Sequence, residues 1–93
     1  MELGTYVVVR TYTAGVHVGT LAAQSGKEVS LVGARRIWSW KGANTLHEIA
    51  QHGVGPGSRV SEPVERIDLT EAIEVIACSE AGAAAIRAAK WAK

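Results

Sequence analysis

The longest predicted strand reads Glu28-Val-Ser-Leu-Val-Gly33-Ala-Arg-Arg-Ile-Trp-Ser-Trp40. Gly33 lies near its middle, and a glycine inside a strand indicates a bulge or a bend. Successive side chains of a strand point to opposite faces, so one extra residue reverses the pattern on one side of the bulge. The alternation therefore leaves open which of Arg35 and Arg36 faces outward.

Two shorter strands precede this one. Thr5–Thr13 is rich in β-branched and aromatic residues, and Val16–Ala23 follows after the turn signal Ala14-Gly15. A second tight turn, Gln24–Lys27, leads into the long strand. The sequence therefore predicts an antiparallel meander over its first three elements.

Two helices are predicted from their capping residues. Thr45 and Glu48 match the capping box, which predicts a short helix from Leu46 to about Gln51. Ser79 caps an alanine-rich terminal helix that we expect to run from Glu80 to about Ala92.

The segment between the helices carries weaker signals. Gly53–Ser58 is a glycine-rich loop, and Arg59–Val64 is predicted as an edge strand because Pro63 excludes a central position. Asp68 is interpreted as a turn or cap residue. Leu69–Cys78 fits both a helical stripe and strand alternation, and its β-branched content favours a strand.

These elements predict an α+β fold: a mainly antiparallel sheet or partly open small barrel, one short inserted helix and a C-terminal helix. The 93 residues form a single domain, 1–93, and the 47% hydrophobic and 20% charged content is typical of a globular protein. The net charge of +1 argues against a strong, sequence-independent nucleic-acid binder, which usually shows a basic excess.

Other features of the sequence predict where the protein is located and whether it self-associates. No apolar run approaches the roughly 20 residues that span a bilayer, and Met1–Gly4 does not begin a signal peptide. Cys78 is the single cysteine and cannot form an internal disulfide, so we expect a cytoplasmic protein. A small domain often gains burial by self-association, so we also expect a homo-oligomer.

Catalysis and cofactor binding find little support in the sequence. His47 and His52 diverge by about 140° around a helix, and with His17 they do not form a zinc-binding pattern. Cys78 follows an apolar run and is expected to pack as a small hydrophobic residue. We therefore predict a protein that is not an enzyme and holds neither a metal nor a cofactor.

The combination of arginine and tryptophan after Gly33 is the best candidate site. Trp38 and Trp40 share one face if the strand stays regular, and an indole ring is a stacking surface for a base. Guanidinium groups grip phosphate oxygens, and the N-terminus of the following helix favours anions. The predicted ligand contacts are Arg35, Arg36, Trp38, Trp40, Lys41, Asn44 and Thr45, with Tyr6, Tyr12 and His17 on neighbouring strands as further lining residues.

A purely structural interpretation stands beside this one. The chain has no phenylalanine, so the tryptophans are candidates for core or interface packing. Arg35 or Arg36 could equally pair with Glu48, Glu62 or Glu65.

The sequence also resembles a small-domain family carried by tailed phages and prophages. The resemblance covers nearly the whole chain, and its most specific part is the Arg-Arg-hydrophobic-Trp-x-Trp motif within Ala34–Ala43. It also rests on Tyr6-Val-Val-Val-Arg10, Gly15-Val-His-Val-Gly19, Leu46-His-Glu-Ile-Ala50, Leu69-Thr-Glu-Ala-Ile-Glu-Val-Ile76 and the C-terminal Ala-Lys-Trp. The family has no assigned function, so the resemblance implies origin more than mechanism. Small oligomeric phage proteins without catalytic residues include sponges, which sequester the nucleotide second messengers of bacterial immune systems.

Three hypotheses follow. The first is a phage-encoded accessory protein that binds a nucleotide-like molecule of the cyclic ADP-ribose or cyclic oligonucleotide type without turnover. The second is a protein-interaction module that inhibits or redirects a host protein, since exposed Trp and Arg are typical hot-spot residues. The third is weak binding of single-stranded nucleic acid, which the nearly neutral charge disfavours.

Overall fold

A computed structural model of the protein describes residues 1–90, and residues 91–93 lie outside the described part. The elements are β1 (Tyr6–Thr11), β2 (Val16–Ser25), β3 (Glu28–Ser39), α1 (Leu46–His52), β4 (Arg59–Val60), β5 (Val64–Leu69), β6 (Ala72–Ala77) and α2 (Glu80–Ala88).

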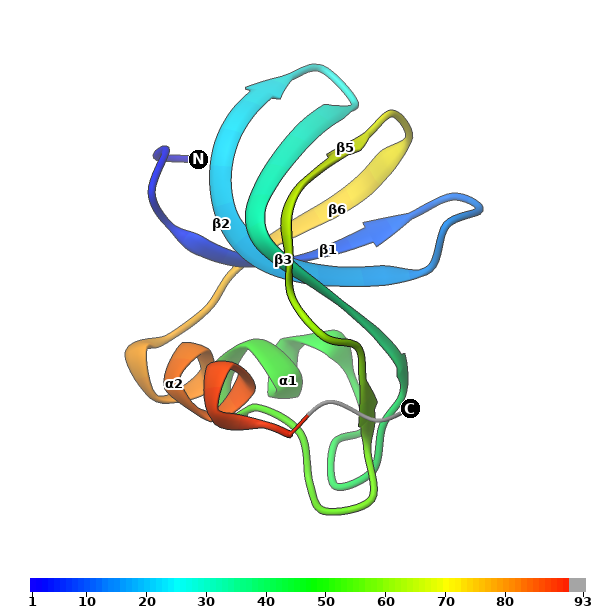
Figure 1. The fold of residues 1–93 in the computed structure, drawn as a ribbon, viewed down its shortest axis with the longest axis vertical. Coiled ribbons are helices and arrows are strands. Elements are labelled where there is room, and N and C mark those ends of the chain that lie inside the picture. Colours follow the sequence, from blue (N-terminus) through cyan, green and yellow to red (C-terminus); the bar gives the residue numbers. More distant parts are fainter. Residues whose placement is uncertain (91–93) are drawn as a thin grey trace.

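The strands form one open antiparallel sheet (Figure 1). β1, β2 and β3 pair in chain order, which confirms the predicted meander. β6 pairs with the other side of β1, while β4 and β5 pair with the other side of β3. Only Thr70 and Glu71 separate β5 from β6, so the sheet bends until its two edges come together at that turn.

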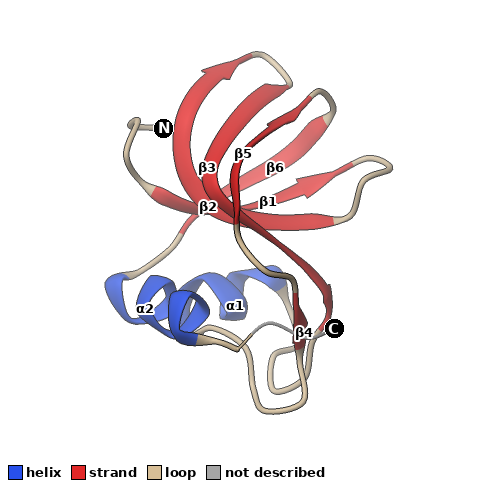
Figure 2. Ribbon diagram, viewed as in Figure 1, coloured by secondary structure: helices blue, strands red, loops and turns tan. Residues whose placement is uncertain are grey.

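The two helices pack together beneath one face of the sheet (Figure 2), as expected for a small α+β fold. Alternation along the strands divides the apolar residues into two clusters. The helix-side core contains Tyr6, Val8, Val16, Val18, Ile37, Ile49, Ala50, Val60, Ala83 and Ile86. The opposite core, inside the bend of the sheet, contains Val7, Val9, Leu21, Val29, Leu31, Ala34, Leu69 and Ala72.

Gly33 forms the predicted bulge. Gly33 and Ala34 together face Gly19 of β2, so β3 carries one extra residue at this point. Gly33 has a φ of +59°, a left-handed conformation that a residue without a Cβ adopts readily. The bulge reverses the alternation, which turns Arg35 towards the helices and leaves Arg36 exposed on the other face.

Two strand predictions need correction. Arg59–Val64 is not one strand: Pro63 lies between β4 and β5, which pair with different parts of β3. β5 itself was not predicted, and Asp68 lies inside it opposite Ser30, so Asp68 is not a turn residue. Leu69–Cys78 does contain a strand, but Leu69 belongs to β5 and β6 begins only after the turn.

Both predicted helix caps are present. The Thr45 hydroxyl accepts a hydrogen bond from Glu48 N at 3.3 Å, and the Ser79 hydroxyl accepts one from Gly82 N at 3.0 Å. The Ser79 hydroxyl also donates to Gln51 O at 2.7 Å, so one residue caps α2 and binds the end of α1. α2 ends at Ala88, earlier than predicted; the last positions of the expected helix lie outside the described residues.

Candidate functional site

Arg35 is buried and faces the helices, so its side chain does not lie with that of Arg36 on the exposed face of β3. Only 5% of Arg35 is exposed, and its Nε donates to Ser61 O at 2.8 Å. Its Nη1 donates to Ile86 O at 2.8 Å and to Arg87 O at 3.5 Å, at the C-terminus of α2. A cation at this end of a helix is favoured because the last carbonyl groups lack partners within the helix. Arg35 thereby joins β3 to α2.

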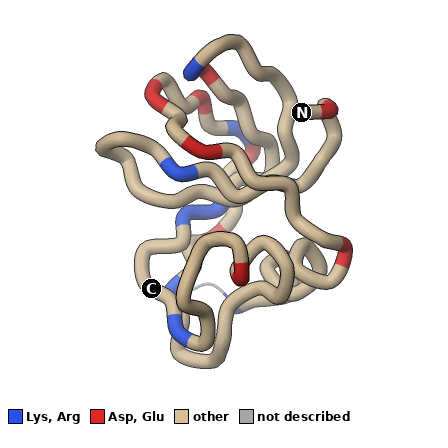
Figure 3. The backbone as a smooth tube through the Cα atoms, turned by 180° about the vertical axis from the view of Figure 1, so that it is seen from behind, with Lys and Arg blue, Asp and Glu red and all other residues tan. Residues whose placement is uncertain are grey.

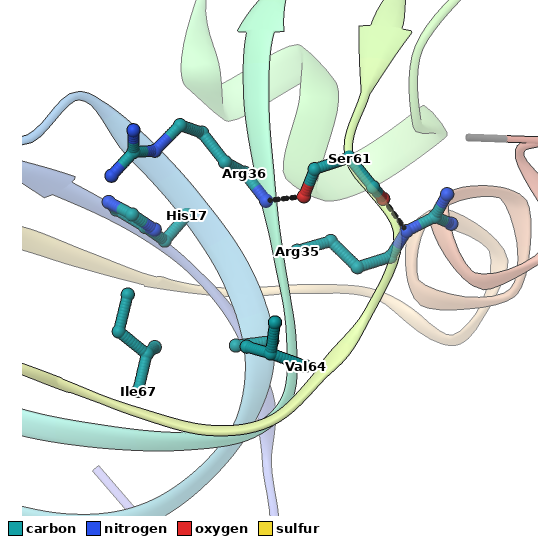
Figure 4. Close-up of a pocket in the computed structure, with 7 residues that line it drawn as sticks. His17, Arg35, Arg36, Ser61, Val64 and Ile67 are labelled. Atoms are coloured by element: carbon teal, nitrogen blue, oxygen red, sulfur yellow. Dashed lines mark hydrogen bonds between the residues drawn. The ribbon is translucent and has the colours of Figure 1, made fainter. Parts of the chain in front are cut away.

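Arg36 points to the opposite side of β3, where it lies beside His17 (Figure 4). Both residues border a cavity of about 240 Å³ whose walls are mostly apolar. The cavity lies between β2, β3, β5 and the segment before β5, and its lining residues are His17, Ala34, Arg35, Arg36, Ser61, Val64 and Ile67. We refer to it as the Arg36 cavity.

His17 forms a buried wall of the Arg36 cavity and is only 1% exposed. Its Nε2 lies 2.9 Å from Ala14 O, and because a carbonyl only accepts, we assign the ring proton to Nε2. Burial lowers the pKa of His17, and the nearby Arg36 lowers it further. The imidazole is therefore neutral at pH 7 and presents no positive charge beside Arg36.

Stability should fall in mild acid because of His17. The lowered pKa means that the unfolded chain binds a proton at higher pH than the folded protein does. The stabilising contribution is complete above the unfolded value of 6.5 and is lost as the pH drops below it. Urea unfolding between pH 7.5 and 5 should show this decline in the wild type and a flatter profile in His17→Gln. Equal slopes in both proteins would contradict the assignment.

Trp38 lies two positions beyond Arg36 on β3 and is 52% exposed. The guanidinium carbon of Arg59 lies 5.4 Å from the centre of its ring, within the range of a cation–π contact. Trp38 is therefore exposed and belongs to neither core, and Arg59 is a neighbour that the sequence did not indicate. Arg36 and Trp38 of β3 and Arg59 of β4 are exposed, and we refer to these three residues together as the Arg–Trp face.

Trp40, Asn44 and Thr45 lie elsewhere. Trp40 is partly buried against the helix-side core, and all three residues border a separate cavity of about 350 Å³ near Arg10 and Glu74. The Thr45 hydroxyl is already bound to the backbone N–H of Glu48, whose carboxylate stands in the first turn of α1. That carboxylate disfavours a bound anion at this helix start.

Lys41 occupies a third place, next to the glycine-rich loop. Its backbone N–H donates to the Ser58 hydroxyl at 2.9 Å, and its side chain lies near Gly57. The seven predicted contacts therefore do not converge on one site. Of these seven, Arg36 and Trp38 belong to the Arg–Trp face.

Three residues of this region were missed by sequence reasoning, namely Arg59, Val64 and Ile67. Val64 and Ile67 lie on β5, a strand that was not predicted, and they form the outer wall of the Arg36 cavity. Arg59 follows the glycine-rich loop directly and begins the predicted edge strand. This position was the feature of the sequence that could have indicated Arg59 as a surface residue of the site.

Figure 3 shows where the charged positions of residues 1–90 lie along the backbone. Acidic positions gather mainly in the sheet, and basic positions are spread over both halves of the molecule. Among residues 1–90, the two ion pairs are Arg10–Glu74 and Arg66–Asp68. Within this part of the chain, Arg36 and Arg59 therefore have no carboxylate partner.

Several other kinds of site find no support in the described part of the chain. Residues 1–90 contain no group of three side chains suited to a metal ion. They also contain no helix that is long and apolar enough to cross a membrane. Burial raises the pKa of Cys78 to about 11, so the thiol stays protonated at neutral pH and is a poor nucleophile.

Comparison with known proteins places the chain in a family. No curated protein and no solved structure matches it. A family model described as "Domain of unknown function (DUF6948)" matches residues 4–86, which is most of the chain and includes both cores and the Arg–Trp face. The protein therefore belongs to the DUF6948 family.

Proposed function

We propose that this protein binds a nucleotide-like anion on the Arg–Trp face and in the adjoining Arg36 cavity, without turning it over. The observation that carries the proposal is Arg36 itself: it is exposed, borders an apolar cavity, has no ion-pair partner among residues 1–90, and stands two positions before the exposed Trp38 on β3. In the cell, we propose a phage-encoded accessory protein that acts in the host cytoplasm. There it would sequester a nucleotide second messenger of a bacterial immune system.

Each part of such a ligand has a matching surface. A flat base can enter the cavity against Val64 and Ile67, and the Arg36 guanidinium can hold a phosphate at its rim. The ring of Trp38 offers a second stacking surface once Arg59 swings towards the phosphate. Stacking on an aromatic ring contributes about 1–3 kcal/mol per base.

Binding without turnover agrees with the chemistry of the nearby groups. His17 is neutral and its Nε2 donates to Ala14 O, and the residues of the described chain that line the Arg36 cavity include no carboxylate. The residues that line the cavity therefore offer a positive rim and mostly apolar walls, and they supply no carboxylate that would pair with His17 in acid–base catalysis.

Thermal unfolding with a panel of cyclic ADP-ribose isomers and cyclic oligonucleotides tests the proposal. A ligand at a hundred times its Kd stabilises the fold by about 2.7 kcal/mol, which raises the Tm of a domain this size by roughly 10–20 °C. Arg36→Ala should weaken binding by about 10–100-fold, because it removes a charge-assisted phosphate contact.

Lys27→Ala is the matched control, since it removes the same charge from the exposed turn between β2 and β3. It should bind as the wild type does. A complete panel that leaves the wild-type Tm unchanged, or equal losses in both variants, would overturn the proposal.

A second candidate function uses the same surface differently. Trp38 and Val64 are both about half exposed, and such residues are typical of interfaces with proteins. Self-association or capture of a host protein would then bury them. Light scattering that gives a larger assembly in the wild type than in Trp38→Ser, without any nucleotide effect, would favour this candidate. Weak binding of single-stranded nucleic acid would instead disappear at high salt.

A further inference from the structure

A further cavity, distinct from the two described above and also of about 350 Å³, lies where the bulge of β3 meets the end of α2. Its walls include apolar side chains from Val32, Pro63 and Ala89. The lining residues with polar side chains are Tyr6, Thr20, Arg35 and Arg87. We refer to it as the Tyr6 cavity.

The hydroxyl group of Tyr6 is buried and has no hydrogen-bond partner in the described residues. Tyr6 is 7% exposed, and a buried polar group without a partner is costly unless something else satisfies it. Burial raises the pKa of Tyr6, so the hydroxyl keeps its proton at neutral pH and remains a donor.

Two positively charged side chains, Arg35 and Arg87, line the same cavity as Tyr6. The guanidinium carbon of Arg87 lies 4.4 Å from the centre of the Tyr6 ring. Arg35 uses Nε and Nη1 for backbone carbonyl groups, and its Nη2 makes no hydrogen bond within residues 1–90. Neither arginine belongs to an ion pair in that part of the chain.

A buried guanidinium is normally matched by an anion. The carbonyl groups at the end of α2 supply only part of a negative charge. The cavity thus combines an excess of positive charge with hydrogen-bond donors that have no partner within residues 1–90 and with an apolar wall.

We propose that the Tyr6 cavity binds a small organic anion by its carboxylate or phosphate group. The anion accepts a hydrogen bond from the Tyr6 hydroxyl and is held by the charges of Arg87 and Arg35. The apolar part of the molecule lies against Val32 and Pro63. This site is separate from the Arg–Trp face, and it does not depend on the function proposed there.

The test is a titration of the full chain with acetate, benzoate and inorganic phosphate, with chloride holding the ionic strength constant. Amide chemical shifts of Tyr6, Gly33 and Ala89 report on the cavity. At least one of the three anions should give saturable shifts at these amides. Tyr6→Phe and Arg87→Gln should each weaken its binding about tenfold.

Lys27→Gln is the control, because Lys27 lies in the exposed turn between β2 and β3, is not among the residues that line this cavity, and should leave the affinity unchanged. Tyr6→Phe keeps the ring in the helix-side core, so its Tm in chloride alone should equal or exceed that of the wild type.

Saturation by benzoate alone would identify a carboxylate ligand, and saturation by phosphate alone would identify a phosphate ligand. Absence of saturable shifts with all three anions, or equal affinities in the wild type and Tyr6→Phe, would overturn the proposal. Arg36 does not line the Tyr6 cavity. The effect of Arg36→Ala on nucleotide binding therefore tests the function proposed for the Arg–Trp face independently of the Tyr6 cavity.

Discussion

Gly82→Ala is expected to destabilise the protein by about 3 kcal/mol or more. Gly82 is buried in α2, where the helix touches the end of α1. A Cβ added there would overlap the carbonyl oxygen of Ala50 and lie 2.8 Å from its carbonyl carbon. Backbone atoms cannot move aside as a flexible side chain can, so the two helices would have to separate.

Urea unfolding monitored by circular dichroism measures this loss. Ala84→Ser is the matched control, since Ala84 lies on the exposed face of the same helix and should change stability by no more than about 0.5 kcal/mol. A wild-type midpoint in Gly82→Ala would mean that the helices do not pack through this glycine.

The fold was largely predictable where local chemistry decides the structure. The meander, the bulge at Gly33 and the caps at Thr45 and Ser79 each depend on residues close in the chain, and all are present. The tight contact between α1 and α2 at Gly82 joins distant segments, so local capping and periodicity could not indicate it.

β5 escaped prediction because its pattern is weak. Glu65, Arg66 and Asp68 are exposed, and only Leu69 is fully buried. Charged residues on an edge strand discourage pairing with other molecules, but they also hide the alternation that identifies a strand. Val64 and Ile67, the residues of β5 that line the Arg36 cavity, were therefore not predicted either.

The geometry of a β-strand explains why only part of the candidate site could be predicted from the sequence. Neighbouring residues of a strand point to opposite faces, so Arg35 and Arg36 could not both reach one ligand. Which of the two is exposed depends on the bulge at Gly33, and the sequence could not decide it. Trp40 and the residues after it leave the strand, so closeness in sequence did not bring them to the Arg–Trp face.

Arg35→Met is expected to cost about 3 kcal/mol of stability. The methionine keeps much of the buried stem but removes the hydrogen bonds to Ser61 O and Ile86 O. Hydrogen bonds from a charged group contribute about 1.5–3 kcal/mol each, and the carbonyl groups left behind are poorly placed to reach water. Arg35→Lys should recover only part of the loss, because one ammonium cannot span both carbonyl groups as the planar guanidinium does.

The neighbouring residue supplies the control. Arg36→Met removes the same charge one position along β3, but from the exposed face, so its unfolding free energy should change by no more than about 0.5 kcal/mol. Hydrogen exchange at the amides of α2 should accelerate in Arg35→Met alone, since only Arg35 binds the end of that helix. Equal effects of the two substitutions would show that β3 does not reverse at Gly33, and the assignment of Arg36 to the ligand surface would fail with it.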